Sequence, residues 1–416
     1  MRVLLVSSNT ERVNMVTMPV GLAMVACACR NAGHEVAVCD LLDAVDPVLA
    51  VQRAIELERP LVIGISVRNI DDQTRASPRF LLEQVRPVVS ACQQATAVPI
   101  VLGGAGYSLF PDAALEYLGA DFGVCGDGEA VFPSLLECIE RGLDPAALAG
   151  VHARGRRDAS PASFAESLDS LPCFDASLLR YARGDVQDLW VPVQSRRGCP
   201  NDCSYCATAA IQGRTIRQRS PAAVVDAIRR YLDAGFRSFY FVDNSFNIPE
   251  RYALELCAAL RALDPKPRWR CILYPHLIHE GLVRSMAEAG CVDVALGFES
   301  GNPGVLREMN KRYAPSDVAE TSRLLALHGI RRSGFLLLGG PGESRASVEQ
   351  SLDFAQSLSL DFLKITVGIR IYPGTRLAER AVKDGMLDPG DDLLMPRFYL
   401  APDLEPWIQQ RVAPSA

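Results

Sequence analysis

The sequence predicts an α/β protein in which a doubly wound, Rossmann-like domain precedes a partial (β/α)6 barrel of the TIM type. Two observations predict this class. Short apolar runs without polar alternation recur along the chain, as expected of parallel strands buried on both faces, and amphipathic segments separate them. The rhythm breaks once, between about residues 142 and 188, and this break divides the 416 residues into two units of ordinary domain size.

The first unit, residues 1–141, alternates predicted strands with predicted helices. The strands are Arg2–Ser7, Glu35–Leu41, Leu61–Val67, Pro99–Gly103 and Asp121–Cys125, and the helices are Pro19–Asn31, Asp46–Glu58, Phe80–Gln94 and Pro111–Leu118. Pro19 suits a first helical turn, and Gly33 suits a helix C-terminus. An open parallel sheet of this kind binds its ligand at the C-terminal ends of its strands.

Residues 142–188 contain several prolines and arginines and little periodicity, so we expect a linker there. The second unit, residues 189–383, has predicted strands at Trp190–Ser195, Ser238–Asp243, Arg270–Tyr274, Asp293–Phe298, Ser333–Leu338 and Phe362–Gly368, with helices such as Ala222–Ala234, Arg251–Leu263 and Ser316–His328 between them. Six such units predict a barrel whose site lies at the C-terminal strand ends. Residues 384–416, rich in proline and aspartate, are expected to be an extension that covers this opening.

Composition excludes several classes of function. Lysine and arginine number 43 against 49 aspartates and glutamates, and this net charge of −6 argues against a general nucleic-acid binder and against an anionic membrane as partner. The uncharged runs Val13–Cys29 and Pro87–Pro111 are interrupted by polar residues and prolines, so we expect no membrane span. The first residues lack the apolar core of a secretory signal. We therefore expect a cytoplasmic protein, in which clustered cysteines are metal ligands or redox thiols.

Three of the thirteen cysteines form a cluster directly after the first predicted barrel strand. Cys199, Cys203 and Cys206 lie on one short loop, where three thiolates can wrap a single metal centre. Structural zinc sites and ferredoxin-type clusters take four ligands, but the next cysteine is Cys257 and the next histidine is His276. An iron–sulfur cubane held by three thiolates leaves one iron open, which predicts a cluster that performs chemistry.

The Cys199-x3-Cys203-x2-Cys206 loop resembles the signature of the radical S-adenosylmethionine (SAM) enzymes. The resemblance implies a [4Fe-4S] cluster whose open iron chelates SAM and yields a 5′-deoxyadenosyl radical, with Tyr205 against the adenine. Later segments follow in the family's order, namely Phe241–Asn244, Gly297–Gly301 with Val305, Met309 and Lys311, and Leu338–Glu343. By this resemblance the expected SAM-binding residues are Asp243, Glu299, Ser300, Gly339 and Gly340.

The first unit is not expected to bind NAD, because its first strand–helix turn, Ser7–Arg12, contains no glycine. Small residues gather instead at the ends of the third, fourth and fifth strands: Ser66, Gly103, Gly104, Gly106, Gly126 and Gly128. Such residues at adjacent strand ends would open a groove for the tail of a long ligand.

Together with the barrel, this unit is similar to the cobalamin-binding module of one radical SAM subgroup, in the segments Met18–Leu22, Ala32–Val36 and Gly126–Glu129. The resemblance implies cobalamin, its tail in the groove of small residues and Glu129 beside it. The first loop has no histidine for the lower face of cobalt, which fits the subgroup. Arg68 is within reach of the corrin, either beneath the cobalt or bound to a corrin amide or a nearby carboxylate.

The resemblance implies methylation of an unactivated carbon, or of phosphorus, in a small-molecule or lipid metabolite, through a 5′-deoxyadenosyl radical and methylcobalamin. Tyr274 and Tyr372, at strand ends, are expected to take part in catalysis. The expected electron donor is a flavodoxin or ferredoxin. Three alternatives stay open: cyclisation or ring rearrangement with the same cofactors, tRNA methylthiolation, and a non-catalytic cobalamin- or cluster-bearing regulator. Methylthiolation would require a second set of cluster cysteines and a basic tail.

Overall fold

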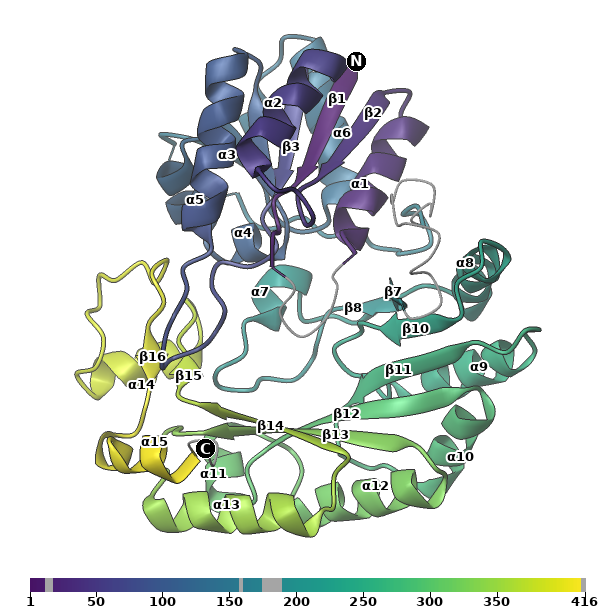
Figure 1. Cartoon of the computed structure of the whole chain (residues 1–416), viewed down its shortest axis with the longest axis vertical. Coiled ribbons are helices and arrows are strands. Elements are labelled where there is room, and N and C mark those ends of the chain that lie inside the picture. The colour runs from purple at the N-terminus through teal and green to yellow at the C-terminus, as the bar shows by residue number, and fades with distance from the viewer. Residues whose placement is uncertain (12–17, 157–159, 174–188, 413–416) are drawn as a thin grey trace.

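The structure is a computed structural model that describes residues 1–11, 18–156, 160–173 and 189–412. Two sheets lie one above the other, each with helices packed against it; the second is parallel throughout and the first is parallel except for its last strand (Figure 1). The predicted fold class is thus confirmed, with a doubly wound sheet first and an open, barrel-like sheet second.

The first sheet has the strand order β2-β1-β3-β4-β5-β6. Its strands are β1 Arg2–Ser7, β2 Glu35–Asp40, β3 Val62–Ser66, β4 Ile100–Gly103, β5 Phe122–Val124 and β6 Val151–Ala153. Its helices are α1 Val20–Asn31, α2 Pro47–Glu58, α3 Leu82–Ala95, α4 Ala105–Leu109, α5 Pro111–Leu118 and α6 Gly128–Glu140. The five predicted strands pair in parallel, and the apolar residues of the inner strands are buried, for example Leu4 and Val6 in β1, whereas those of the edge strand β2 are only partly buried.

Three elements of this domain were not predicted. Helix α4 begins directly after Gly104, and α6 begins at Gly128, with Asp127 at its N-cap. Strand β6 pairs antiparallel with β5, so that the first sheet continues into the range expected to be linker. The later part of that range, residues 174–188, lies outside the described residues.

The second sheet has the order β14-β13-β12-β11-β10-β7, and all its pairings are parallel. Its strands are β7 Trp190–Val193, β10 Ser238–Phe241, β11 Arg268–Leu273, β12 Cys291–Glu299, β13 Arg331–Leu338 and β14 Phe362–Val367. The outer helices are α8 Pro221–Asp233, α9 Glu250–Arg261, α10 Glu280–Glu288, α11 Pro303–Glu308, α12 Pro315–Leu327 and α13 Arg345–Ser357. All six predicted barrel strands are present.

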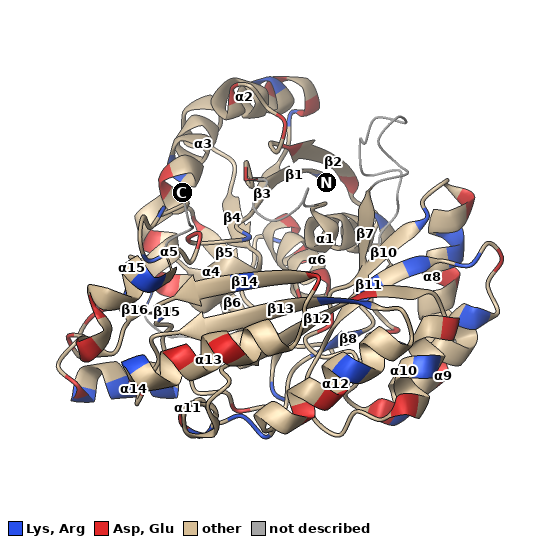
Figure 2. Cartoon of the chain, turned by 60° about the horizontal axis from the view of Figure 1, so that its bottom comes forward, with Lys and Arg blue, Asp and Glu red and all other residues tan. Residues whose placement is uncertain are grey.

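Two small antiparallel ribbons and three further helices complete the second domain. The ribbons pair β8 Arg196–Arg197 with β9 Arg217–Gln218 and β15 Ile369–Arg370 with β16 Phe398–Tyr399, and the helices are α7 Thr208–Gln212, α14 Arg376–Lys383 and α15 Trp407–Val412. Lys/Arg and Asp/Glu are interspersed on the outer helices (Figure 2). Among the described residues, no helix combines the length and the apolar character that crossing a bilayer requires.

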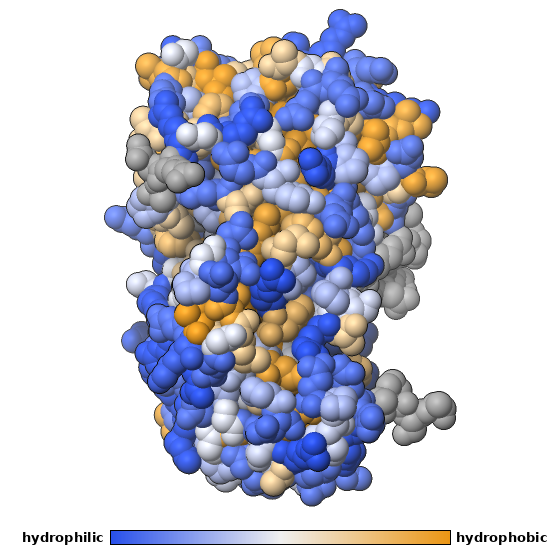
Figure 3. Space-filling model, turned by 90° about the vertical axis from the view of Figure 1, so that its left-hand side faces the viewer, coloured by the Kyte–Doolittle hydropathy of each residue, from blue (hydrophilic) through white to orange (hydrophobic). Residues whose placement is uncertain are grey.

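The loop between β3 and α3 reaches from the first domain down to the β15–β16 ribbon (Figure 1). Asp71 accepts a 2.7 Å hydrogen bond from Arg370 Nε, and both side chains are at most 3% exposed. Gln73 donates to the Tyr372 hydroxyl at 2.8 Å, and Arg75 pairs with the more exposed Glu405 at 2.7 Å. Apolar residues reach the surface in the middle of the face that Figure 3 shows, where the two domains meet.

Candidate active site

The cysteine loop lies between β8 and α7 and is fixed from several sides. Gly198 has φ +91°, and a Cβ there would collide with the carbonyl oxygen of Thr215, so glycine is required. Within the loop, the Ser204 amide donates to Met309 O at 3.1 Å. Asn310 Nδ2 donates to Asp202 O at 2.6 Å. These contacts hold the loop that carries the three thiols against the end of α11.

The three thiols differ in their surroundings. Cys199 and Cys203 are half-buried and Cys206 is exposed. Burial raises the pKa of the Cys199 and Cys203 thiols, and the nearby Lys311 ammonium opposes this rise. No three Cys, His, Asp or Glu side chains of the described residues come close enough together to hold one metal ion. In a [4Fe-4S] cubane each thiolate would bind a different iron, and Cys199, Cys203 and Cys206 are the residues of this loop that would hold such a cluster.

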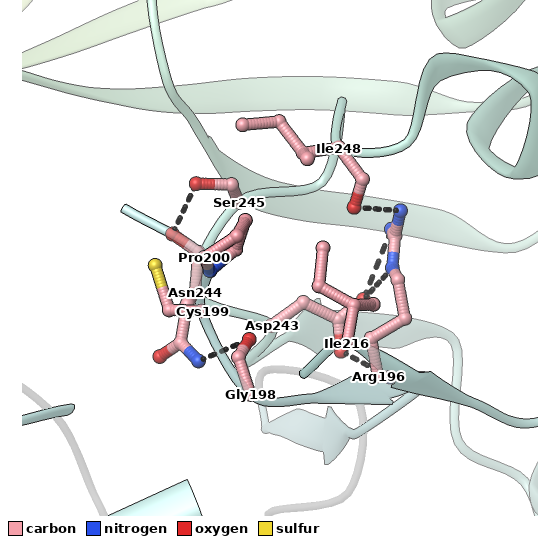
Figure 4. Close-up of a pocket in the computed structure, with 9 residues that line it drawn as sticks. All are labelled: Arg196, Gly198, Cys199, Pro200, Ile216, Asp243, Asn244, Ser245 and Ile248. Carbon is pink, nitrogen blue, oxygen red and sulfur yellow. Dashed lines mark hydrogen bonds and ion pairs between the residues drawn. The ribbon is translucent and has the colours of Figure 1, made fainter. Parts of the chain in front are cut away.

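Asp243 and Arg196 lie beneath this loop, and Figure 4 shows them with Cys199. Asp243 is 1% exposed and accepts hydrogen bonds from the Ser195 amide at 2.8 Å, the Ser195 hydroxyl at 2.5 Å and the Arg196 amide at 3.0 Å. The Arg196 guanidinium adds contacts at 3.1 and 3.2 Å. These contacts fill both carboxylate oxygens. Asp243, expected to bind SAM, therefore holds Arg196 and the start of the cluster loop.

Lys311 occupies the centre of a charged, aromatic cluster beside Cys203. Its ammonium lies 3.2 Å from Glu299 Oε1, and both side chains are nearly buried, at 5% and 13% exposed. It also lies 5.1 Å from the ring centre of Tyr205, and about as close to two further tyrosine rings, Tyr274 and Tyr313. Glu299 has φ +61°, a strained conformation that turns the end of β12 toward the loop.

The glycine-rich turn after β13 is organised by its own glutamate. Glu343 Oε2 accepts hydrogen bonds from the amides of Gly339 and Gly340, the latter at 3.0 Å. Its other oxygen is buried without a partner among the described residues, and burial raises the pKa of Glu343 to about 7. Ser300, also expected to bind SAM, is fully buried, and its hydroxyl lies 2.9 Å from that of Ser351. The amides of the two glycines and the Ser300 hydroxyl therefore have protein partners.

The hydroxyls of the two tyrosines expected in catalysis also accept hydrogen bonds from other protein groups. The Tyr274 hydroxyl accepts a hydrogen bond from the Arg312 amide at 2.9 Å, and its ring packs edge-on against Tyr313. The Tyr372 hydroxyl accepts from Gln73, which belongs to the first domain. Burial, followed by the nearby Asp71 carboxylate, raises the pKa of Tyr372 to about 12. Tyr274 thus lies in the Lys311 cluster, whereas Tyr372 lies at the junction of the domains.

A cavity of about 430 Å³ opens between the C-terminal edge of the first sheet and the second domain. Of the residues expected to bind cobalamin, seven line it: Ser66, Arg68, Gly103, Gly104, Gly126, Gly128 and Glu129. Pro192, Tyr240 and Gln212 line it from the second domain. Its volume falls in the range of roughly 300–1,000 Å³ that is typical of cofactor sites.

The glycines do two different things at this cavity. A Cβ at Gly103 would meet only Val124 O, at 3.9 Å, and would project into open space, so this glycine makes room for a ligand. At Gly104 a Cβ would lie 2.6 Å from Val67 O, and at Gly106 3.0 Å from the Arg68 backbone. These two let the loop after β4 pack against the loop after β3. Gly106 does not line the cavity, unlike the others expected to do so.

Glu129 lines the cavity, but its carboxylate is bonded to the second domain. It accepts from Arg197 Nη2 at 2.6 Å, and Arg197 Nη1 lies 2.7 Å from Asp127. Arg217 also pairs with Asp127. Burial alone would raise the pKa of Asp127, but the arginines outweigh it and hold this pKa below its ordinary value. The sequence analysis did not anticipate these partners, although paired arginines before a cysteine loop and paired carboxylates after β5 are both visible in the sequence.

Comparison with known proteins agrees with this geometry. The family model of the radical SAM superfamily matches residues 193–355, and that of the B12 binding domain matches residues 7–136. An uncharacterized methyltransferase of Pyrococcus horikoshii is 25% identical over 93% of this chain and 84% of that protein. The tryptophan 2-C-methyltransferase of Streptomyces laurentii is 24% identical over 89% of this chain and 73% of that protein.

A solved structure has the same fold over nearly the whole chain. The radical SAM methyltransferase TsrM from Kitasatospora setae, with tryptophan and a SAM analogue bound, superposes with a TM-score of 0.86 at 23% identity. The match covers 98% of this chain and 87% of that one.

Two further relatives bear on the class of reaction. The cytidylyl-2-hydroxyethylphosphonate methyltransferase of Streptomyces wedmorensis is 25% identical over 91% of this chain and 80% of that protein. By contrast, a tRNA-2-methylthio-N(6)-dimethylallyladenosine synthase of Clostridium novyi matches over only 39% of this chain and 38% of its own length. The comparisons thus support methylation over the alternatives.

The cysteine loop carries three thiols that would hold a [4Fe-4S] cluster, a cavity lies at the strand ends of the first domain, and the family models of the B12 binding domain and the radical SAM superfamily match the two domains in the expected order. This chain therefore belongs to the cobalamin-binding radical SAM enzymes.

Proposed function

We propose that this enzyme methylates an unactivated carbon, or a phosphorus, of a small-molecule or lipid metabolite. The observation that carries the proposal is that the two cofactor sites share a wall. Arg197 and Gln212 line the cobalamin cavity. Both also lie at the start of the cluster loop, because Arg197 directly precedes Gly198 and Gln212 Oε1 accepts a hydrogen bond from the Gly198 amide. When bound, the cluster with SAM supplies a radical oxidant and cobalamin supplies a methyl group. A substrate held between the two sites is within reach of both.

The chain's own residues then have distinct tasks. Cys199, Cys203 and Cys206 hold the cluster, and the Lys311–Glu299 pair presents fixed charges beside it. We propose that Arg68, which lines the cavity, contacts the corrin. Tyr274, in the Lys311 cluster, orients groups at the site, whereas Tyr372 joins the two domains through Gln73. Both keep their protons, because the pKa of each hydroxyl is raised, mainly by burial.

Several features argue against tRNA methylthiolation and suit a reducing environment. Charges of both signs are interspersed on the outer helices, and Cys27 and Cys29 lie in α1 and Cys39 in β2, not on a loop that could hold a second cluster. All thirteen cysteines are free, which suits the cytoplasm. We propose a flavodoxin or ferredoxin as the electron donor and no nucleic-acid partner.

The test separates methyl transfer from other radical reactions without knowledge of the substrate. Anaerobically reconstituted enzyme is incubated with SAM and a reductant, with or without bound cobalamin, and L-tryptophan serves as a first substrate probe. S-adenosylhomocysteine forms when SAM donates its methyl group, whereas 5′-deoxyadenosine forms on radical cleavage. We expect S-adenosylhomocysteine only when cobalamin is bound. Cobalamin-loaded enzyme that releases 5′-deoxyadenosine alone would contradict methyl transfer and favour cyclisation or rearrangement.

A further inference from the structure

We propose that Asp127 and Glu129 couple cobalamin binding to cluster binding, acting as positioning residues through Arg197 and Arg217. The inference rests on the two cofactor sites and not on the transfer of a methyl group.

The four side chains form a buried, charge-balanced network between the domains. Arg197 donates to Asp127 Oδ1 at 2.7 Å and to Glu129 at 2.6 and 3.2 Å. Arg217 pairs with the other oxygen of Asp127, which also accepts from the Ala165 amide at 2.9 Å. All four side chains are between 4% and 9% exposed. Two carboxylates of the first domain are thus neutralised by two arginines of the second, away from water.

This arrangement differs from what the local sequence alone would produce. Asp127 stands at the N-cap of α6, where an aspartate usually accepts a hydrogen bond from the first turn of its own helix. Here its side chain makes no such bond, because both oxygens face the arginines and the Ala165 amide. The Gly126–Glu129 segment therefore lines the cobalamin cavity, while its two carboxylates are bonded to arginines of the other domain.

Two short paths lead from this network to the first cluster ligand. Along the chain, Arg197 in β8 is followed by Gly198 and Cys199. Through space, Arg217 donates to the Gln212 carbonyl at 2.9 Å, and Gln212 Oε1 accepts from the Gly198 amide at 3.2 Å. The Cys199 amide donates to Gly213 O at 3.1 Å.

The walls of the cavity and the start of the cluster loop are therefore one hydrogen-bonded unit. A ligand that fills the cavity orders residues that must also be ordered when the cluster binds. The cofactor that binds second therefore loses less conformational entropy and binds more tightly. Coupling of binding equilibria is reciprocal, and a typical coupling changes each affinity by roughly 5- to 150-fold. We expect a cluster-loaded protein to bind cobalamin about tenfold more tightly than a cluster-free one.

The first experiment measures the dissociation constant of hydroxocobalamin by equilibrium dialysis, with and without the reconstituted cluster. The wild-type ratio is expected to be about ten, and it should fall to about one in Glu129→Gln, which keeps the size of the side chain and removes its charge. Glu405→Gln is the matched control, because it also removes a carboxylate that pairs across the domains, with Arg75 in place of Arg197. Its ratio should remain that of the wild type.

A second measurement uses only the wild-type protein, so that a folding defect in the variant leaves the proposal testable. Hydroxocobalamin added to cluster-free protein should slow amide hydrogen exchange in residues 195–218 as well as in the first domain. A wild-type ratio of one, an unchanged ratio in folded Glu129→Gln, or protection confined to the first domain would overturn the proposal. None of these outcomes depends on S-adenosylhomocysteine, so failure of the coupling and failure of methyl transfer are distinguishable.

Discussion

The two sheets form their ligand sites with opposite kinds of side chain. The first domain makes space, since Ser66, Gly103 and Gly104 at its strand ends leave a cavity of about 430 Å³. The second domain concentrates charge, since Lys311 and Glu299 meet among tyrosines beside the cysteine loop. A large cofactor needs room and a close backbone, whereas a small reactive centre needs fixed charges in a site that excludes water. The same parallel architecture therefore serves both, and the residues at the strand ends decide which.

Removing a cluster ligand should have the largest effect, because it should abolish cluster binding and leave cobalamin binding intact. Cys203→Ala is expected to abolish cluster binding and the formation of 5′-deoxyadenosine, because the remaining thiols hold only two irons. Cobalamin should still bind. The checks are iron content and product analysis, with Cys138→Ala in α6 as the control for loss of a thiol elsewhere. A Cys203→Ala enzyme that still forms 5′-deoxyadenosine would refute the cluster assignment.

Filling the cavity should have the opposite result, in which cobalamin binding is weakened and the cluster is retained. In Gly103→Leu the side chain would extend from a position where a Cβ meets only Val124 O at 3.9 Å, so the fold should survive while the cavity is occupied. We expect the affinity for hydroxocobalamin to fall at least about 100-fold, with iron content unchanged, since about 3 kcal/mol of contact is lost. The affinity of Gly103→Ala for hydroxocobalamin should lie between those of Gly103→Leu and the wild type. Full cobalt content in Gly103→Leu would mean that cobalamin binds elsewhere.

The contacts that join the domains differ in burial, and their removal should differ in cost. Asp71→Asn leaves Arg370 buried without its anion and should lower the free energy of unfolding by about 3–5 kcal/mol. Glu405→Gln removes an exposed partner of Arg75 and should cost less than about 1 kcal/mol. Urea titration of cofactor-free protein measures both. Equal effects of the two changes would show that burial does not control the strength of this junction.

The buried carboxyl in the turn after β13 predicts a pH dependence. Folding raises the pKa of Glu343 from 4.5 to about 7, so the folded state binds this proton more tightly, and the contribution of Glu343 to wild-type stability should fall as pH rises from about 4.5 to 7. Glu343→Gln lacks this loss and should be more stable than the wild type by up to about 3 kcal/mol at pH 8, but not at pH 4.5. Urea titrations at both pH values check this. An advantage that does not grow with pH would contradict a buried, proton-favouring carboxyl.

Much of the fold follows from local pattern. The buried strands of both sheets are apolar enough to be located within one or two residues, and Asp46 with Pro47 marks the start of α2, where Asp46 accepts from the Leu49 amide. Strand β6 was missed because three residues are too few for a periodic signal and its partner, β5, is antiparallel to it. The cysteine spacing and the glycines at strand ends predict where both cofactors bind, because spacing and the absence of a side chain are properties of the chain itself.

The sequence by itself thus determined the two parallel sheets, the cysteine loop and the cavity of small residues. Only the tertiary structure decided the partners of the charged side chains. Asp243 accepts from Ser195 and Arg196, Glu129 binds Arg197 of the other domain, and Lys311 lies among tyrosines. A buried charge must find an opposite charge or a donor wherever the fold brings one near, and the bonded partners of Lys311, Asp243 and Glu129 lie 12, 48 and 68 residues away in the chain.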